Sequence, residues 1–182
     1  MVGNINMVFY EYISLKHSPE VWIEIADVLK LKEQFVVQGS AYPDAMTYKI
    51  AEAASTVLKI PQSKILHEIG KYYVVDVLHN QYDNLKLLPG KTLKDILEYL
   101  PTYHNRLGII QPYLHLPTFL SRPLGERGYE IWYKGETLDD HLFIIGLLDG
   151  IIQVYNYGVS ATVKQTKKRS SKEQFDVYEI HW

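Results

Sequence analysis

The spacing of apolar residues changes partway along this chain, and that change constrains the fold more than any other feature. Up to His104 the apolar side chains recur every three or four positions, which is the period of amphipathic helices. From Phe119 onward, short segments alternate apolar and polar residues as strands do, and one long apolar helix is inserted at 138–155. A helical part followed by short antiparallel strands predicts an α+β domain.

Capping residues and prolines mark the expected elements. Thr92 and Asp95 have the spacing of a capping box and predict the start of the helix that carries the chain to His104. Asp44 follows Pro43 and is expected to cap another helix start. The expected helices are 5–15, 19–30, 44–58, 61–78, 92–104 and 138–155, and the expected strands after Phe119 include 129–133, 159–166 and 175–180.

Length and charge narrow the class of protein. A chain of 182 residues is long enough for one domain with a sizeable core, and a second domain is not expected. The formal net charge of -2 gives no electrostatic reason to expect a nucleic acid or an anionic membrane as a partner. The basic residues are scattered except for four, which we interpret as a solvated hairpin loop: Lys164, Lys167, Lys168 and Arg169.

The sequence lacks several residue types and motifs, and these absences narrow the chemistry and the location that we expect. The chain has no cysteine, which excludes disulfides, thiolate ligation of haem iron and iron–sulfur clusters. It has no secretory signal pattern and no apolar run of membrane-spanning length, so we expect a cytoplasmic protein. It also has no glycine-rich phosphate loop, and we expect no enzymatic activity. Asp139, Asp140 and His141 lie at a helix start, where acidic residues are favoured for capping and dipole reasons rather than as metal ligands.

His104 stands apart from the other histidines. It lies between a predicted helix and an apolar run, and no carboxylate occurs within five residues of it. One use for such an imidazole is axial ligation of a haem iron, for which the porphyrin supplies the other four nitrogens. The alternative is a core histidine that is hydrogen-bonded to a carbonyl group, and spacing alone favours this alternative.

Motifs spread from residue 1 to about residue 178 occur in the order and spacing of one family. They resemble the H-NOX (haem nitric oxide/oxygen-binding) domains, known also as the sensor half of soluble guanylate cyclase. No single motif is decisive, but their order over almost the whole chain makes the resemblance specific. The matching segments are Val2-Gly3-Asn4-Ile5-Asn6, Tyr42-Pro43-Asp44, Thr47-Tyr48, Ala53-Ala54-Ser55, Ile69-Gly70-Lys71-Tyr72-Tyr73, His104-Asn105-Arg106-Leu107-Gly108, Leu116-Pro117-Thr118-Phe119 and Ile145-Gly146-Leu147-Leu148-Asp149-Gly150.

The resemblance implies a single domain, residues 1–182, with haem b held between two lobes. A helical distal lobe would comprise approximately residues 1–60. A proximal lobe, residues 61–182, would carry a four-stranded antiparallel sheet together with helices.

The resemblance also implies roles for individual residues. His104 would be the proximal ligand of the iron, and Pro117 would press on the porphyrin and bend it. Ile5 and Phe9 would touch the ring from the distal lobe. Tyr133 would belong to the motif that holds the haem propionates.

That propionate motif departs from the family pattern. The family has Tyr-x-Ser-x-Arg, whereas this chain has Tyr133-Lys134-Gly135-Glu136-Thr137, with glycine and threonine in place of serine and arginine. An arginine makes short, charge-assisted, bidentate bonds to a carboxylate, and neither Gly135 nor Thr137 can replace them. We therefore expect haem to be held more weakly through its propionates than in a typical relative.

Two distal residues bear on the choice of gas. Oxygen-binding members carry a tyrosine that donates a hydrogen bond to bound dioxygen, and the matching residue here is Phe143. A phenyl ring cannot donate such a bond, which favours nitric oxide and also allows carbon monoxide. Tyr73 lies where relatives have a residue that faces the distal pocket, so its hydroxyl could either supply a donor or bond to a helix carbonyl or solvent, and the second arrangement is favoured.

The function implied is a haem-based nitric oxide sensor. Binding of nitric oxide would release His104 from the iron and let the haem flatten against Pro117. A separate effector, such as a histidine kinase or a cyclic-dinucleotide enzyme, would read the change. The alternative, motivated by Gly135 and Thr137, is a degenerate H-NOX-like module that has lost haem and serves in protein interaction.

Overall fold

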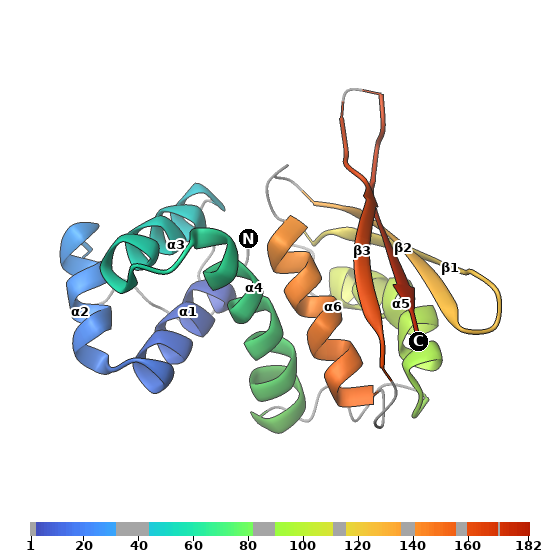
Figure 1. The fold of residues 1–182 in the computed structure, drawn as a ribbon, viewed down its shortest axis with the longest axis horizontal. Helices are drawn as coiled ribbons and strands as arrows, with labels where there is room; N and C mark the ends of the chain where they lie inside the picture. Colours follow the sequence, from blue (N-terminus) through green and yellow to red (C-terminus); the bar gives the residue numbers. More distant parts are fainter. Residues whose placement is uncertain are drawn as a thin grey trace.

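Helices gather at one end of the molecule and a sheet at the other, with α4 and α6 between them (Figure 1). The computed structural model describes residues 3–31, 44–81, 90–110, 116–135, 141–155, 160–170 and 172–182. The helices are α1 (Gly3–Lys16), α2 (Pro19–Val28), α3 (Asp44–Leu58), α4 (Gln62–Tyr72), the π-helix η1 (Tyr73–Gln81), α5 (Leu93–Ile110) and α6 (His141–Tyr155). The strands are β1 (Thr118–Pro123), β2 (Gly128–Lys134), β3 (Thr162–Lys167) and β4 (Asp176–His181).

The sheet has four strands in the order β1-β2-β4-β3, and all neighbours are antiparallel. The predicted α+β class and four-stranded antiparallel sheet are therefore confirmed. The register aligns Phe119 of β1 with Tyr133 of β2, and Tyr133 with Asp176 of β4. Since paired residues of neighbouring strands project from the same face, these three side chains form one row across the sheet.

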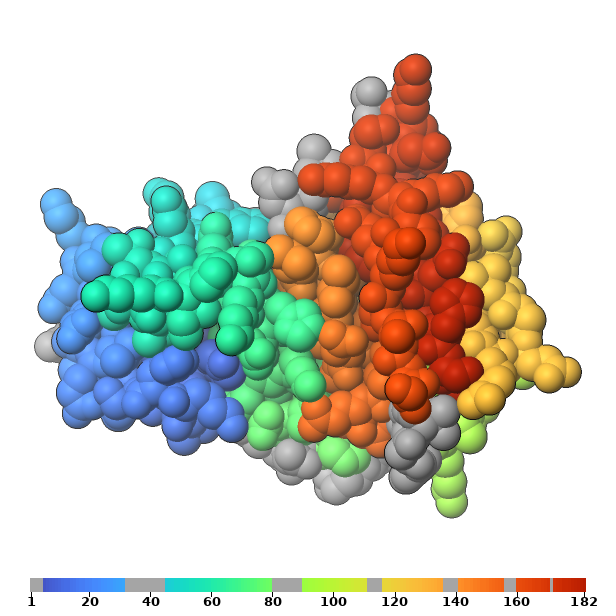
Figure 2. Space-filling view, viewed as in Figure 1, coloured from blue at the N-terminus to red at the C-terminus, as the bar shows by residue number. Residues whose placement is uncertain are grey.

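The two faces of the sheet have different environments. Tyr129, Ile131 and Tyr133 of β2 are buried in the core, and α5 packs against β1 while α6 packs against β3. Glu130 and Trp132 alternate with them and therefore project from the opposite face. The β3–β4 hairpin projects beyond the body of the protein in the space-filling view (Figure 2).

Glycines bring α4 and α6 into close contact. A Cβ atom at Gly146 would overlap the carbonyl oxygen of His67, and one at Gly70 would overlap the carbonyl oxygen of Phe143. A hydrogen bond of 2.7 Å between His67 Nε2 and Asp149 Oδ2 spans the same pair of helices. This interface joins the helical end of the molecule to the end that carries the sheet (Figure 1).

Several local predictions are confirmed. The backbone N–H of Asp95 donates to Thr92 Oγ1 at 3.2 Å, and the N–H of Thr92 donates to Asp95 Oδ2 at 3.1 Å. This is the reciprocal pair of bonds that defines a capping box. The helix predicted to end at Leu58 ends there, and β2 and β4 lie within one residue of the predicted ranges.

Other predicted boundaries are wrong. Helix α5 continues six residues past His104 to Ile110. The sequence did not predict this extension, because a short apolar run is compatible with either a strand or further helix. The helix predicted over 61–78 is α-helical only to Tyr72 and then becomes π-helical, which apolar spacing also does not reveal. The helix predicted over 19–30 ends at Val28, and Lys30 has a positive φ of 53° that no α-helix accommodates.

Some predicted features lie outside the described residues. They are Val2, Tyr42, Pro43, Glu136, Thr137, Leu138, Asp139 and Asp140. Within the described ranges, no helix is both long and apolar enough to cross a membrane.

Candidate functional site

His104 lies on α5, and its imidazole is anchored to the preceding turn of the same helix. Its Nδ1 atom lies 3.0 Å from the carbonyl oxygen of Leu100. A carbonyl can only accept, so Nδ1 carries the proton and Nε2 presents a lone pair. A histidine that is hydrogen-bonded in this way through one nitrogen is oriented to ligate a metal through the other.

The surroundings of His104 keep the imidazole neutral. Burial lowers the pKa of His104 below its usual value, and the hydrogen bond to the Leu100 carbonyl offsets this effect only in part. A neutral imidazole is the form that ligates a metal. The donor set therefore fits a single axial nitrogen ligand. Among the residues that the structure describes, no group of three or more histidines or acidic residues could hold a metal ion. An iron bound by His104 would therefore need its other ligands from a cofactor such as a porphyrin.

An aromatic contact connects His104 to the sheet. The ring centroid of Phe119 lies 4.3 Å from that of His104, with the planes tilted by 40°. The Phe119 ring in turn lies 5.2 Å from the ring of Tyr133, its partner across the strands. His104 and Tyr133, two residues expected to hold haem, are thus connected by Phe119, which belongs to a matching segment but was not predicted to be a site residue. The sequence did not predict these two contacts of Phe119, because one depends on the packing of α5 against β1 and the other on the register of β1 and β2.

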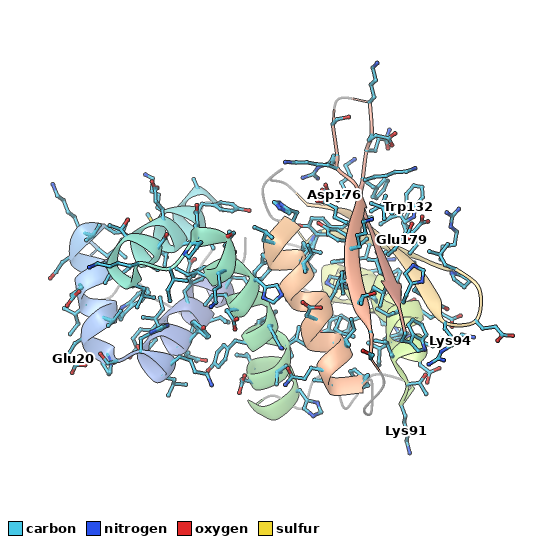
Figure 3. The ribbon with its side chains drawn as sticks, in the orientation of Figure 1. Glu20, Lys91, Lys94, Trp132, Asp176 and Glu179 are labelled. Carbon is cyan, nitrogen blue, oxygen red and sulfur yellow. The ribbon has the colours of Figure 1, made fainter. Side chains whose placement is uncertain are left out.

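The end of the sheet beyond Tyr133 holds a buried charged pair. Asp176, which is 3% exposed, lies next to Tyr133 across β2 and β4. The Arg169 guanidinium lies beside it, with 3.8 Å between Nε and Asp176 Oδ2, and its Nη1 donates a hydrogen bond to the carbonyl of Gly135. Figure 3 shows Asp176 at the end of β4 from which the hairpin projects.

The interpretation of Arg169 as part of a solvated loop is wrong. Its side chain is only 9% exposed. Lys164, Lys167 and Lys168 are exposed as predicted, but Lys164 and Lys167 belong to strand β3 rather than to a loop. The difference arises because the hairpin brings the backbone N–H of Arg169 to within 2.9 Å of Asp176 Oδ1, which turns the guanidinium back toward the sheet. Charge patterning along the sequence contains no signal for such a contact.

The remaining expected site residues lie on other elements. Ile5 and Phe9 of α1 and Phe143 of α6 are buried in the same core as Phe119 and Tyr133. Pro117 is half-buried just before β1, and Tyr73 is half-buried at the start of η1.

Comparison with known proteins assigns the family. A model of the family described as Haem-NO-binding matches residues 2–163. The chain belongs to the haem-NO-binding (H-NOX) family. This family comprises haem-based gas sensors, and the H-NOX domain is itself a sensor domain rather than a catalytic one. The resemblance identified from the motifs is thereby confirmed.

Curated relatives of this H-NOX chain are much longer proteins. Soluble guanylate cyclase gcy-33 of Caenorhabditis elegans is 21% identical over 154 residues, which are 83% of this chain and 16% of that protein. Soluble guanylate cyclase 89Da of Drosophila melanogaster is 19% identical over 159 residues, 87% of this chain and 24% of that protein. The chain therefore spans between about a sixth and a quarter of the length of these relatives.

Solved H-NOX structures share the fold. An H-NOX protein from S. oneidensis, a triple mutant in the Fe(II) ligation state, superimposes with a TM-score of 0.84 at 14% identity and covers 100% of this chain and 95% of its own. The unliganded Fe(II) H-NOX protein from K. algicida gives a TM-score of 0.77 at 18% identity, with coverage of 100% and 96%. At these identities the similarity establishes the architecture alone.

Proposed function

We propose that this chain is a nitric oxide sensor in which Nε2 of His104 ligates the iron of haem b. The observation that carries the proposal is the hydrogen bond between His104 Nδ1 and the Leu100 carbonyl, because it leaves Nε2 as the ligating nitrogen. The lowered pKa of His104 supports it further, since a neutral imidazole needs to lose no proton before ligation.

The other contacts of the haem follow from the expected site residues. Ile5 and Phe9 would touch the porphyrin from the distal side, and Pro117 would press on it from the side of His104. Tyr133 would contribute its phenol at the propionate edge. When bound, the haem supplies an open coordination position for a diatomic gas. The helical distal lobe, approximately residues 1–60, and the proximal lobe, 61–182, would enclose it as a single domain.

Phe143 and Tyr73 set the proposed selectivity. The buried Phe143 ring offers no hydrogen-bond donor to a bound gas. Dioxygen on iron carries partial negative charge and benefits from a donor, whereas nitric oxide needs little such help. The site therefore favours nitric oxide and admits carbon monoxide, provided that the Tyr73 hydroxyl bonds elsewhere.

Release of His104 is the proposed signal. His104 would hold the iron through Nε2, and the haem would supply the coordination position that nitric oxide takes. On release, His104 would stay hydrogen-bonded to Leu100 and move with α5, and its contact with Phe119 would pass the change to Tyr133. Such a shift between two states requires only that the gas bind one state more tightly than the other. A signalling effector in the cytoplasm, such as a histidine kinase or a cyclic-dinucleotide enzyme acting in trans, would read the shift.

A haem-free interaction module is the second candidate. Gly135 favours it, because this residue has no side chain with which to replace the serine of the propionate motif. The two functions are separated by an absorption spectrum of the protein supplied with haem and reduced. A ferrous Soret band that shifts when nitric oxide is added supports the sensor, and a spectrum identical to that of free haem supports the interaction module.

A further inference from the structure

We propose that the outer face of the sheet, which is the face turned away from α5 and α6, docks a protein partner through an extended acidic segment of that partner. Of the described helices, α5 and α6 pack against the strands, and both lie on the inner face. There Ser121 Oγ donates to the Glu98 carbonyl of α5, and Val163 of β3 packs into the core with α6. The described helices therefore leave the outer face open. The proposal needs no haem, so it goes beyond the proposed sensor function and does not depend on it.

An apolar cluster forms the centre of the outer face. The register aligns Leu120, Trp132 and Val177 across β1, β2 and β4, so their side chains form one row. Val177 is only 2% exposed although it is not part of the main core, which means that its neighbours on the outer face bury it. The Phe175 ring lies edge-on to Trp132 with 6.0 Å between centroids, and Leu120 at the open end of the row is 47% exposed. Large apolar side chains of this kind anchor protein interfaces.

Cations surround this cluster. The Arg122 guanidinium and Lys167 Nζ lie 5.7 Å and 5.9 Å from the centroid of the Trp132 ring. A cation–π contact does not neutralise the charge of the lysine. Lys164 lies on the same face in the adjacent row, opposite Glu179. Its side chain is exposed and forms no ion pair within the described part of the chain.

The carboxylates of the outer face, in contrast, have partners on that face. Glu130, which is 7% exposed, accepts a hydrogen bond of 2.7 Å from Trp132 Nε1 and forms an ion pair with Arg122. Glu179 Oε2 lies 3.3 Å from Nε2 of His181. Figure 3 shows Trp132 and Glu179 on neighbouring strands of the sheet. The lysines are therefore the charges that this face offers to a partner.

These charges favour an acidic protein segment over two other occupants. A second copy of this chain would bring the lysines of two outer faces together, and like charges opposed across an interface cost several kcal/mol. An anionic membrane would need Trp132 to insert, whereas Trp132 is half-buried and its Nε1 is bonded to Glu130. An acidic segment needs neither arrangement, because its carboxylates can approach Lys164 and Lys167 from solvent.

The dimensions of the row fit an extended segment. Leu120 and Lys167 stand at opposite ends of the row, three strand spacings or about 14 Å apart. Four residues of an extended chain span about the same distance, at roughly 3.4 Å each. An apolar residue that packs on Leu120 and Trp132 would therefore place a carboxylate four positions along the segment beside Lys167.

A labelled synthetic peptide tests the proposal by fluorescence anisotropy with the full chain. The probe carries a leucine pair and a glutamate pair four residues apart in a serine background; one control peptide has glutamine for glutamate, and another has serine for leucine. The parent should bind the probe more tightly than either control peptide. Lys164→Glu combined with Lys167→Glu should weaken binding of the probe about tenfold, as expected for two exposed charge pairs. Lys94→Glu, an exposed lysine of α5, is the matched control and should bind as the parent does.

A second variant tests the apolar end of the row. Leu120→Ser should weaken binding of the probe but leave the serine-for-leucine peptide unaffected, because that peptide has no apolar contact to lose. The side chains replaced in these variants are exposed, so the variants are expected to keep the fold.

Several results would overturn the proposal. Equal affinity of the parent for the probe and its glutamine version is one, and binding unchanged by reversal of both lysines is another. Sedimentation of the parent alone and flotation with vesicles of phosphatidylcholine and phosphatidylserine test the other occupants. Self-association or vesicle binding that the lysine reversal abolishes, without binding of the probe, would replace the acidic partner by a second copy or by a membrane. None of these measurements needs haem, so their failure leaves the proposed sensor function intact.

Discussion

The imidazole Nδ1 of His104 lies 3.0 Å from the carbonyl oxygen of Leu100, four residues earlier on α5. This contact places the imidazole proton on Nδ1 and leaves the lone pair on Nε2, and it ties the orientation of the ring to the helix backbone. Any displacement of the imidazole is consequently transmitted to α5 itself. The contact therefore connects the proposed iron ligand directly to an element that can carry a signal.

Replacement of His104 by glycine should abolish the ferrous Soret band of the haem-loaded protein. Added imidazole should restore it, because the small molecule can occupy the space left by the side chain and supply the same nitrogen. Absorption spectra of the reduced protein with and without imidazole are the measurement, and His17→Ala, an exposed histidine on the helical end, is the control. A His104→Gly spectrum identical to that of the parent would show that another residue ligates the iron.

Restoring the family motif should slow haem loss. Gly135→Ser together with Thr137→Arg would add a hydroxyl and a guanidinium at the propionates, worth about 1.5–3 kcal/mol if new charged hydrogen bonds form. Haem-loss rates of the parent and of the double variant, obtained by transfer to an acceptor globin, are the measurement. An unchanged rate would show that other groups already hold the carboxylates.

The ferrous protein should bind nitric oxide and carbon monoxide but form no stable complex with dioxygen. The reason is that Phe143 cannot donate a hydrogen bond to the bound gas. Visible spectra of the reduced protein mixed with air-saturated buffer provide the measurement. A lasting oxygen-bound spectrum that disappears in Tyr73→Phe would identify Tyr73 as the donor and make the protein an oxygen binder.

Gly146→Ala should destabilise the fold by about 1–3 kcal/mol, because overpacking forces backbone shifts. The added methyl group would overlap the carbonyl oxygen of His67, and neither helix backbone can yield locally. Gly108→Ala on α5 is the matched control, since a Cβ there meets nothing within 4 Å. The control should gain up to about 1 kcal/mol of helix propensity. Urea unfolding of both variants measures the difference, and equal stabilities would contradict the close approach of α4 and α6.

Thr92→Ala should reduce the free energy of unfolding by about 1 kcal/mol, the usual cost of removing a helix N-cap.

Hydrogen bonds from the Thr92 side chain and from the Thr92 and Lys91 backbones hold the pKa of Asp95 below its usual value of 3.8. A lowered carboxyl pKa contributes stability above the unfolded value, and that contribution disappears as the pH falls through the folded value. The stability difference between the parent and Asp95→Asn should therefore be full at neutral pH and shrink below about pH 3.8. A difference that stays constant with pH would argue against the capping box.

Local chemistry was sufficient for the features that depend on residues close in sequence. The capping box of Thr92 and Asp95 is confirmed because its two bonds span only three residues. Alternation over 129–133 likewise predicted a strand there, which is β2, and the order of helices and strands indicated the α+β class. The family resemblance could be identified from motif order for the same reason, since each motif is a short continuous segment.

The tertiary structure alone decided which distant residues meet. The contact of His104 with Phe119, and the placement of Asp176 beside Tyr133, depend on strand register, which a shift of one residue would reverse. Arg169 looks in sequence like its exposed lysine neighbours, and only the return of the hairpin onto Asp176 and Gly135 buries it. The spacing of apolar residues along the chain indicates whether a segment forms a helix or a strand. The burial and pairing of a side chain, in contrast, depend on groups that the fold brings in from elsewhere in the chain.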